Sequence, residues 1–164
     1  MGRMLLAVCL VGLVLAGCFA PREQVAARNW RPMGASGLPL GQLVARTPGL
    51  KSVTWESFVD GRGRTVARLA AEYAPAGAYS GCPAPEPGLA LAARSFLLLD
   101  LAVSPEGAVE FQAATAQAYD AAGYYEEYTL DAGVVAALVA GVCPVPCADL
   151  RLPAYLEKGP GSSS

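Results

Sequence analysis

The chain has 164 residues, of which 54% are hydrophobic and 16% charged, with a formal net charge of −2, five cysteines and no histidine. This length predicts one domain, with or without a short appendage. The isoelectric point near 5.1 argues against the basic surface typical of nucleic-acid binding, so we expect no nucleic-acid partner. The absence of histidine removes the commonest general base, the Ser–His and Cys–His pairs and the usual zinc ligand, and we expect neither those catalytic centres nor a metal site.

The amino-terminal segment combines a positive stretch, an apolar run and a cysteine. Arg3 and the amino terminus precede the apolar run Leu5–Ala16. This run is shorter than the ~20 residues that span a bilayer and has the length of a signal-peptide core. It closes on Leu15-Ala16-Gly17-Cys18, which resembles the lipobox of bacterial lipoproteins. An ordinary secretory leader and a short anchor helix are the alternatives.

The lipobox resemblance implies a specific processing of the chain. Residues 1–17 would be removed as a signal peptide, and Cys18 would carry diacylglycerol and an acyl chain such as palmitate on its new amine. Each buried methylene of such chains contributes roughly 0.8 kcal/mol, so several chains anchor a protein stably. Phe19 follows Cys18, where the inner-membrane retention signal of enteric bacteria has Asp. The resemblance therefore favours the outer membrane over the inner, and we expect no cofactor besides the lipid.

The next segment, residues 18–39, is rich in Arg, Gly and Pro and shows little periodicity. We interpret it as a tether with one helical turn around Glu23–Arg28, which would hold the body off the lipid headgroups. The alternative is that Trp30 packs on the domain and orders the segment. Residues 40–157 are expected to form the domain, and residues 158–164 a disordered tail.

A short helix and a hairpin are predicted at the start of the domain. Leu40–Arg46 is the helix, ended by Pro48-Gly49. Ser52–Val59 and Thr65–Tyr73 both alternate between apolar and polar residues. The turn between them, Asp60-Gly61-Arg62-Gly63, contains the glycine that a tight hairpin turn needs.

A second hairpin follows a Pro- and Gly-rich connection over residues 74–94, where we expect no regular structure. Ser95–Val103 is an almost continuous apolar run, as in a central strand buried on both faces. After the turn Ser104-Pro105-Glu106-Gly107, the chain alternates from Val109 and the strand reaches Tyr119.

The carboxy-terminal part predicts a helix. Asp131 can cap a helix over residues 132–142, with Val134, Leu138 and Val142 in one stripe. Its apolar character nearly all round indicates burial against the sheet, and its β-branched valines leave a strand as the alternative. Leu150–Leu156 is a short closing segment. Together the elements predict an α+β domain, a mostly antiparallel four-stranded sheet from two hairpins packed by one or two helices on one face.

The body also has a generic resemblance to known proteins. Trp55-Glu56-Ser57-Phe58, the glycine turn after it and the later Val109-Glu110-Phe111 are similar to the pattern of small uncharacterised bacterial envelope lipoproteins. The similarity covers residues 40–120. It implies a compact extracytoplasmic domain and assigns no catalytic residue.

Three cysteines remain beyond the lipobox, and an oxidising compartment favours a disulfide among them. We expect Cys82 to pair with Cys143 or Cys147, which closes a loop of about 60 residues and contributes roughly 3–4 kcal/mol. A Cys143–Cys147 bridge and no bridge at all are the alternatives. The two prolines between these residues favour extended backbone, which keeps their Cα atoms too far apart for a bridge without a turn.

The run Tyr124-Tyr125-Glu126-Glu127-Tyr128 is the most unusual surface candidate. Aromatic rings beside carboxylates can line a groove for sugar or peptide, so Tyr124, Tyr125, Glu126 and Tyr128 form a candidate binding surface. The simpler interpretation is a strand edge with Tyr124 and Tyr128 packed inward. Neighbouring Glu126 and Glu127 would point to opposite faces of a strand, so they cannot flank one bond as a glycosidase pair.

Charge is divided unevenly along the chain. Residues 18–94 carry nine Lys or Arg and five Asp or Glu, whereas residues 95–164 carry two and nine. Basic residues near the anchor suit anionic headgroups, and the acidic half suits a basic partner. Solvated faces without a partner are the simpler interpretation.

These observations predict a non-enzymatic, lipid-anchored envelope lipoprotein whose domain is an accessory or binding module. Its partners would be the membrane, through the lipid, and another envelope protein. One alternative is a small envelope hydrolase that uses Asp and Glu on cell-wall glycan. The other is a permanent structural subunit of an envelope assembly.

Overall fold

The computed structural model describes residues 20–34, 37–74, 86–145 and 151–153. Within them the chain forms helices and strands in the order α2 (Arg22–Asn29), α3 (Leu40–Ala45), β1 (Leu50–Val59), β2 (Thr65–Tyr73), β3 (Leu89–Leu91), β4 (Arg94–Val103), β5 (Val109–Tyr119), β6 (Tyr125–Leu130), α4 (Gly133–Ala140) and β7 (Arg151–Pro153).

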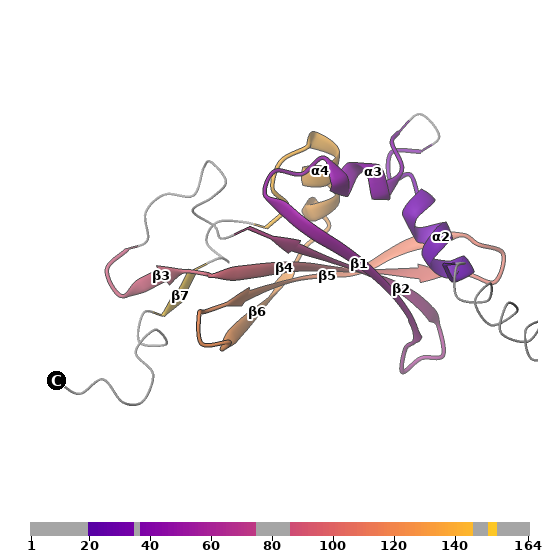
Figure 1. Ribbon diagram of the computed structural model, residues 1–164. Helices are drawn as coiled ribbons and strands as arrows, with labels where there is room; N and C mark the ends of the chain where they lie inside the picture. Colours follow the sequence, from indigo (N-terminus) through magenta and orange to yellow (C-terminus); the bar gives the residue numbers. More distant parts are fainter. Residues whose placement is uncertain (1–19, 35–36, 75–85, 146–150, 154–164) are drawn as a thin grey trace, which may run out of the picture.

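The main sheet is antiparallel, with the strand order β1-β2-β4-β5-β6, and α2, α3 and α4 lie on one of its faces (Figure 1). The α+β class, both hairpins and the placement of helices on one face are confirmed, but three helices lie there rather than one or two. The predicted number of four strands is wrong, because β6 adds a fifth strand beside β5. The strand-edge interpretation of residues 124–128 is thus correct from Tyr125 on, although the sequence of β6, YEEYTL, lacks the regular apolar alternation that identifies a strand.

The core lies between this sheet and the helices. We call the sheet face under the helices the covered face. Its strand residues are Ala67, Leu69, Ala71, Tyr73, Leu97, Leu99, Leu101, Ala114 and Ala116, and the helices contribute Ala27, Leu40, Leu43, Val44, Val134 and Leu138. Strand β4 was expected to be buried on both faces. Instead, Leu97, Leu99 and Leu101 are buried, whereas Phe96 and Leu98 on the other side are only half-buried.

A β-bulge in β5 completes the covered face. Asp100 pairs with Ala113 but the next residue, Leu101, pairs with Phe111, so Gln112 is the extra residue. Side chains alternate along a strand, and one inserted residue reverses the alternation beyond it. The bulge therefore turns Phe111 and Val109 towards the core, where both pack against the buried cluster.

The segment before the predicted domain is ordered where the structure describes it. Helix α2 buries Ala27 completely, and Trp30 packs against the core. The amide of Leu40 donates to the carbonyl of Trp30 at 2.7 Å, which joins α2 to α3. Ala27 and Trp30 thus pack against the core of the sheet, as the alternative to the tether expects.

Helix α4 settles the ambiguity over residues 132–142 in favour of a helix. Asp131 accepts a hydrogen bond from the amide of Gly133 at 2.7 Å, at the start of the helix. Val134 and Leu138 are buried as predicted, but Val142 is exposed. The helix ends at Gly141, whose φ of 69° is left-handed, so the chain leaves the helical stripe before Val142.

A second, two-stranded sheet pairs β3 with β7. The expectation that residues 74–94 have no regular structure is therefore wrong for Leu89–Leu91. Strand β7, its partner, lies some 60 positions further along the chain, so no local sequence pattern predicts the pairing of β3 with β7. Leu152 of β7 is buried and clusters with Ala92 and Ala118, which places this small sheet over one end of the covered face.

Candidate functional site

The face of the main sheet opposite the helices is the candidate site, and we call it the open face. The strand registers and the alternation of burial define its members. They are Ser52, Thr54, Glu56 and Phe58 of β1; Val66, Arg68, Ala70 and Glu72 of β2; Arg94, Phe96, Leu98, Asp100 and Ala102 of β4; Glu110, Ala113, Thr115, Gln117 and Tyr119 of β5; and Tyr125, Glu127 and Thr129 of β6.

Three aromatic rings from neighbouring strands form a row at one end of the open face. The rings of Phe96 and Tyr119 meet edge to face with their centroids 5.5 Å apart. The ring of Tyr119 stacks on that of Tyr125, its direct cross-strand partner, at 5.0 Å. Aromatic pairs at such distances are favourable beyond the area they bury. The outermost ring, Tyr125, is 54% exposed and so presents the row to solvent.

Polar groups flank this aromatic row. The guanidinium of Arg94 lies 5.1 Å from the ring centre of Phe96 and donates to Glu72 Oε1 at 3.2 Å. The Tyr119 hydroxyl donates to Gln117 Oε1 at 3.2 Å, and Gln117 Nε2 donates to Glu127 Oε2 at 2.9 Å. Rings with fixed donors and acceptors beside them are the combination that recognises a partly apolar, partly polar ligand.

The centre of the open face is held by an ion pair. Arg68 donates from Nε to Asp100 Oδ1 at 2.7 Å and from Nη2 to Asp100 Oδ2 at 2.8 Å. The hydrogen bond to Asp100 raises the pKa of Arg68, against a smaller opposing effect of burial. The same guanidinium lies 5.0 Å from the ring centre of Phe58. This two-point pairing holds both side chains against each other on the open face, across neighbouring strands β2 and β4.

The sequence-predicted surface residues are divided by the fold. Tyr124, in the turn after β5, and Tyr125 are both exposed. Glu126 and Tyr128 face the other side of β6, where the Tyr128 hydroxyl donates to Glu126 Oε2 at 2.6 Å and contacts the carbonyl of Arg151 at 3.3 Å. The inward packing of Tyr128 is confirmed and that of Tyr124 is wrong. The four residues therefore do not form one surface.

Phe96 and Tyr119 complete the aromatic row but were not candidates from the sequence. Phe96 belongs to an apolar run that reads as core. Tyr119 lies six positions before Tyr125 and reaches it only through the β5–β6 register. The turn signal Asp120-Ala121-Ala122-Gly123 could have indicated that register, because a hairpin there pairs the residues on either side of it.

Three carboxylates among the described residues have a displaced pKa. In all three the displacement of the pKa is downwards. For Asp60 the backbone amide of Arg64 is the main cause, and for Glu106 the hydroxyl of Ser104. For Glu72, burial acts to raise the pKa, but hydrogen bonds from Arg94 and Lys51 outweigh it and lower the pKa. As predicted, Glu126 and Glu127 point to opposite faces of a strand.

Most of the cysteines with a predicted role lie outside the residues that the structure describes. Cys18, Cys82 and Cys147 lie outside the described residues. Cys143 is half-buried after α4, with Sγ 3.6 Å from the carbonyl oxygen of Val145. The disulfide and the lipid attachment therefore stay predictions. Within the described parts of the chain, no group of three or more Cys, Asp or Glu side chains is placed to hold a metal ion.

Comparison of the chain with family models, with curated proteins and with solved structures gives no match. Among the residues that the structure describes, no helix has both the length and the apolar character needed to cross a membrane. The function must therefore be inferred from the residues themselves. Their clearest features are the lipobox-like sequence Leu15-Ala16-Gly17-Cys18 and the aromatic row of the open face.

Proposed function

We propose that the protein is a lipid-anchored lipoprotein of the bacterial cell envelope whose α+β domain is a non-enzymatic binding module. The membrane would hold the protein through lipid on Cys18. The open face would receive the ligand, which we propose to be another envelope component with both apolar and hydrogen-bonding groups, such as a peptide segment of a partner protein or a glycan. The outer membrane is the proposed location.

The observation that carries the binding role is the aromatic row on a sheet face that no described helix or strand covers. Phe96, Tyr119 and Tyr125 present ring surface that a soluble protein would ordinarily bury, and Tyr125 is more than half exposed. Aromatic side chains with a polar end are enriched at binding surfaces because they bury large areas at low entropic cost. Arg94 and Gln117 hold neighbouring rings in place, so the surface needs little rearrangement to bind.

The start of the fold supports the anchoring role. Helix α2 begins at Arg22, four positions after Cys18. Four residues of extended chain span at most about 14 Å. A lipid on Cys18 would therefore hold the domain directly at the membrane surface rather than on a long stalk.

Fatty-acid labelling of the full chain in bacterial cells tests the anchoring. We expect wild type to incorporate azido-palmitate and to remain with the membranes, because an acylated amino terminus partitions into lipid. Cys18→Ser should lose the label and leave the membrane fraction. The matched control is Cys9→Ser, in the apolar run of the leader, which should behave as wild type. Label that persists in Cys18→Ser, or is missing from wild type, contradicts the proposal.

A further inference from the structure

Helix α4 has an unusual composition for a helix at the surface. All eight of its residues, Gly133–Ala140, are apolar or glycine, yet only Val134 and Leu138 are buried. Val139 is 37% exposed, and Val142 just after the helix is exposed as well. A helix on the surface of a soluble domain normally carries polar residues on its outer side. The outer side of α4 thus has the character of a buried surface.

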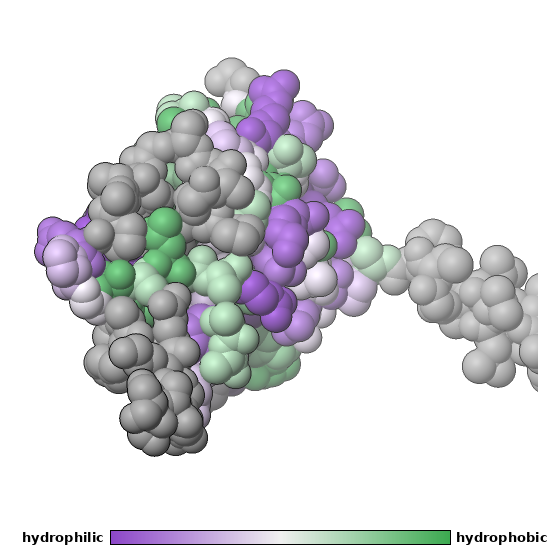
Figure 2. All heavy atoms as spheres, turned by 60° about the vertical axis from the view of Figure 1, so that its left-hand side comes forward, coloured by the Kyte–Doolittle hydropathy of each residue, from purple (hydrophilic) through white to green (hydrophobic). Residues whose placement is uncertain are grey.

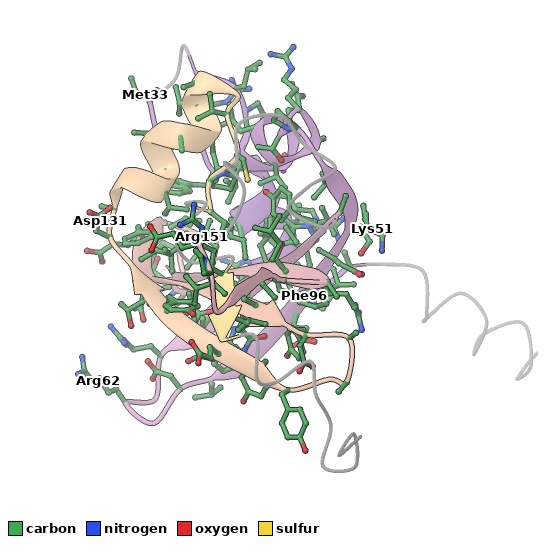
Figure 3. All side chains as sticks on the ribbon, turned by 90° about the vertical axis from the view of Figure 1, so that its left-hand side faces the viewer. Met33, Lys51, Arg62, Phe96, Asp131 and Arg151 are labelled. Carbon is green, nitrogen blue, oxygen red and sulfur yellow. The ribbon has the colours of Figure 1, made fainter. Side chains whose placement is uncertain are left out.

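An apolar groove lies beside this helix. Its volume is about 360 Å³, and its lining has no charged side chain: Trp30, Pro32, Met33, Phe111, Ala132, Val135, Ala136 and Val139. Met33, which follows α2, is 63% exposed. Figure 3 shows Met33 next to α4, at the opposite end of the view from Arg62. We define the helix layer as α2, α3, α4 and the described residues 30–34 and 37–39 between the first two helices. The groove and α4 form one apolar surface within this layer.

The rest of the helix layer is basic. Residues 20–46 contain four arginines and one acidic residue, Glu23. The four, Arg22, Arg28, Arg31 and Arg46, are all exposed. Asp131 adds one exposed carboxylate beside α4. Figure 2 views the molecule from its β3–β7 side with the helix layer at the top, where hydrophilic and hydrophobic residues both reach the surface.

We infer that the outer surface of the helix layer docks on an anionic lipid bilayer, beside the lipid anchor. Arginines around exposed apolar side chains are the combination by which proteins bind at a membrane interface. The inference rests on the proposed function for the anchor, which brings α2 to the bilayer first. One anchor and one surface together hold a protein more stably than either alone. In this orientation the open face points away from the membrane, towards its ligand.

Fluorescence quenching by brominated lipids tests the docked orientation. Trp55→Phe leaves Trp30, in the groove, as the only tryptophan. The full chain carrying this change is purified from bacterial cells with any lipid that they attach, and its intact mass shows whether Cys18 is lipidated. It is then mixed with vesicles of phosphatidylcholine, alone or with one quarter phosphatidylglycerol, containing brominated phosphatidylcholine. We expect Trp30 to be quenched at least twofold more on the anionic vesicles.

Matched substitutions locate the contact. Val139→Asp on α4 and Arg46→Glu after α3 should each reduce the quenching at least twofold. The controls make the same changes at exposed residues outside the helix layer, Val59→Asp at the end of β1 and Arg62→Glu in the β1–β2 turn, and should leave it unchanged. Hydrogen exchange of wild type tests the same contact without any substitution. On anionic vesicles, amide exchange should slow in peptides covering residues 133–140 and stay unchanged in peptides covering residues 113–119.

The outcomes separate this inference from the proposed function. Lipidated chain that floats with the vesicles while Trp30 stays unquenched and residues 133–140 unprotected overturns the docked orientation and leaves the anchor intact. A mass without lipid overturns the anchor, and the same vesicles then test the surface alone, for which we still expect binding that weakens as salt rises. Equal quenching on neutral and anionic vesicles, or equal effects of the test and control variants, also overturns the inference.

Discussion

The two faces of the five-stranded sheet are built by the same strands and yet differ in almost every property. On the covered face, β4 and β5 contribute leucines and small alanines that are fully buried under the helices. On the open face, the alternate positions carry ion pairs, hydrogen-bonded amides and aromatic rings. Strand geometry makes this possible, because neighbouring side chains point to opposite sides. The covered face determines stability, and the open face is available for binding.

The largest expected effect is on the free energy of unfolding, and it should differ between two adjacent leucines of β4. Leu99 is completely buried on the covered face, and Leu98 is half-buried on the open face. Leu99→Ala should lower the free energy of unfolding by about 3 kcal/mol, because it leaves a cavity as well as removing apolar contacts. Leu98→Ala should cost about 1 kcal/mol, since much of its surface meets water already. Urea denaturation measures both, and equal losses would show that the open face is packed in solution.

A smaller effect is expected from the ion pair at the centre of the open face. Asp100→Asn should reduce the free energy of unfolding by about 1 kcal/mol, because it removes the charge from a two-point, partly buried hydrogen-bonded pair. Lys51→Met is the control. Its ammonium lies 3.3 Å from Glu72 at an exposed position, where an ion pair contributes little. Equal losses in the two variants would contradict a special role for the Arg68–Asp100 pair.

The smallest effect concerns pH. The pKa of Glu72 is lowered in the fold, because hydrogen bonds from Arg94 and Lys51 outweigh its burial. Its contribution to stability is therefore present above the ordinary pKa of 4.5 and is lost as the pH falls through the lower folded value. Glu72→Gln should make stability depend less steeply on pH below about 4.5. Urea titrations from pH 3 to 7 measure the two slopes, and identical slopes would contradict this expectation.

The sequence predicted the elements that local patterns determine. Asp60-Gly61-Arg62-Gly63 and the alternation on both sides of it were enough for the first hairpin, and the apolar run of β4 identified a central strand. The packing of helix α2 was left open between two interpretations, since its inward side offers only small residues such as Ala27. The pairing of β3 with β7 and the bulge at Gln112 depend on contacts between distant segments, which no local pattern contains.

The candidate site was predicted in part. Tyr125 was found because three tyrosines beside two glutamates are unusual in composition. Phe96 and Tyr119 were not, because the aromatic row exists only once β4, β5 and β6 are in register. Tyr128 has the same residue type as Tyr125 but lies three positions further along β6, on the covered face, where its hydroxyl is hydrogen-bonded. Which tyrosine is available for binding therefore depends on the side of the strand that its side chain faces, rather than on composition.

Photo-crosslinking in living cells tests most directly whether the open face binds a partner while the outer surface of the helix layer binds lipid. A photoreactive residue replaces Tyr125 on the open face or Val139 on the helix layer, in the full chain, and the captured material is identified by mass spectrometry. We predict that position 125 captures one abundant envelope protein or glycan and that position 139 captures membrane lipid. Lipid captured equally at both positions, or a single partner captured at 139 and none at 125, would contradict the account.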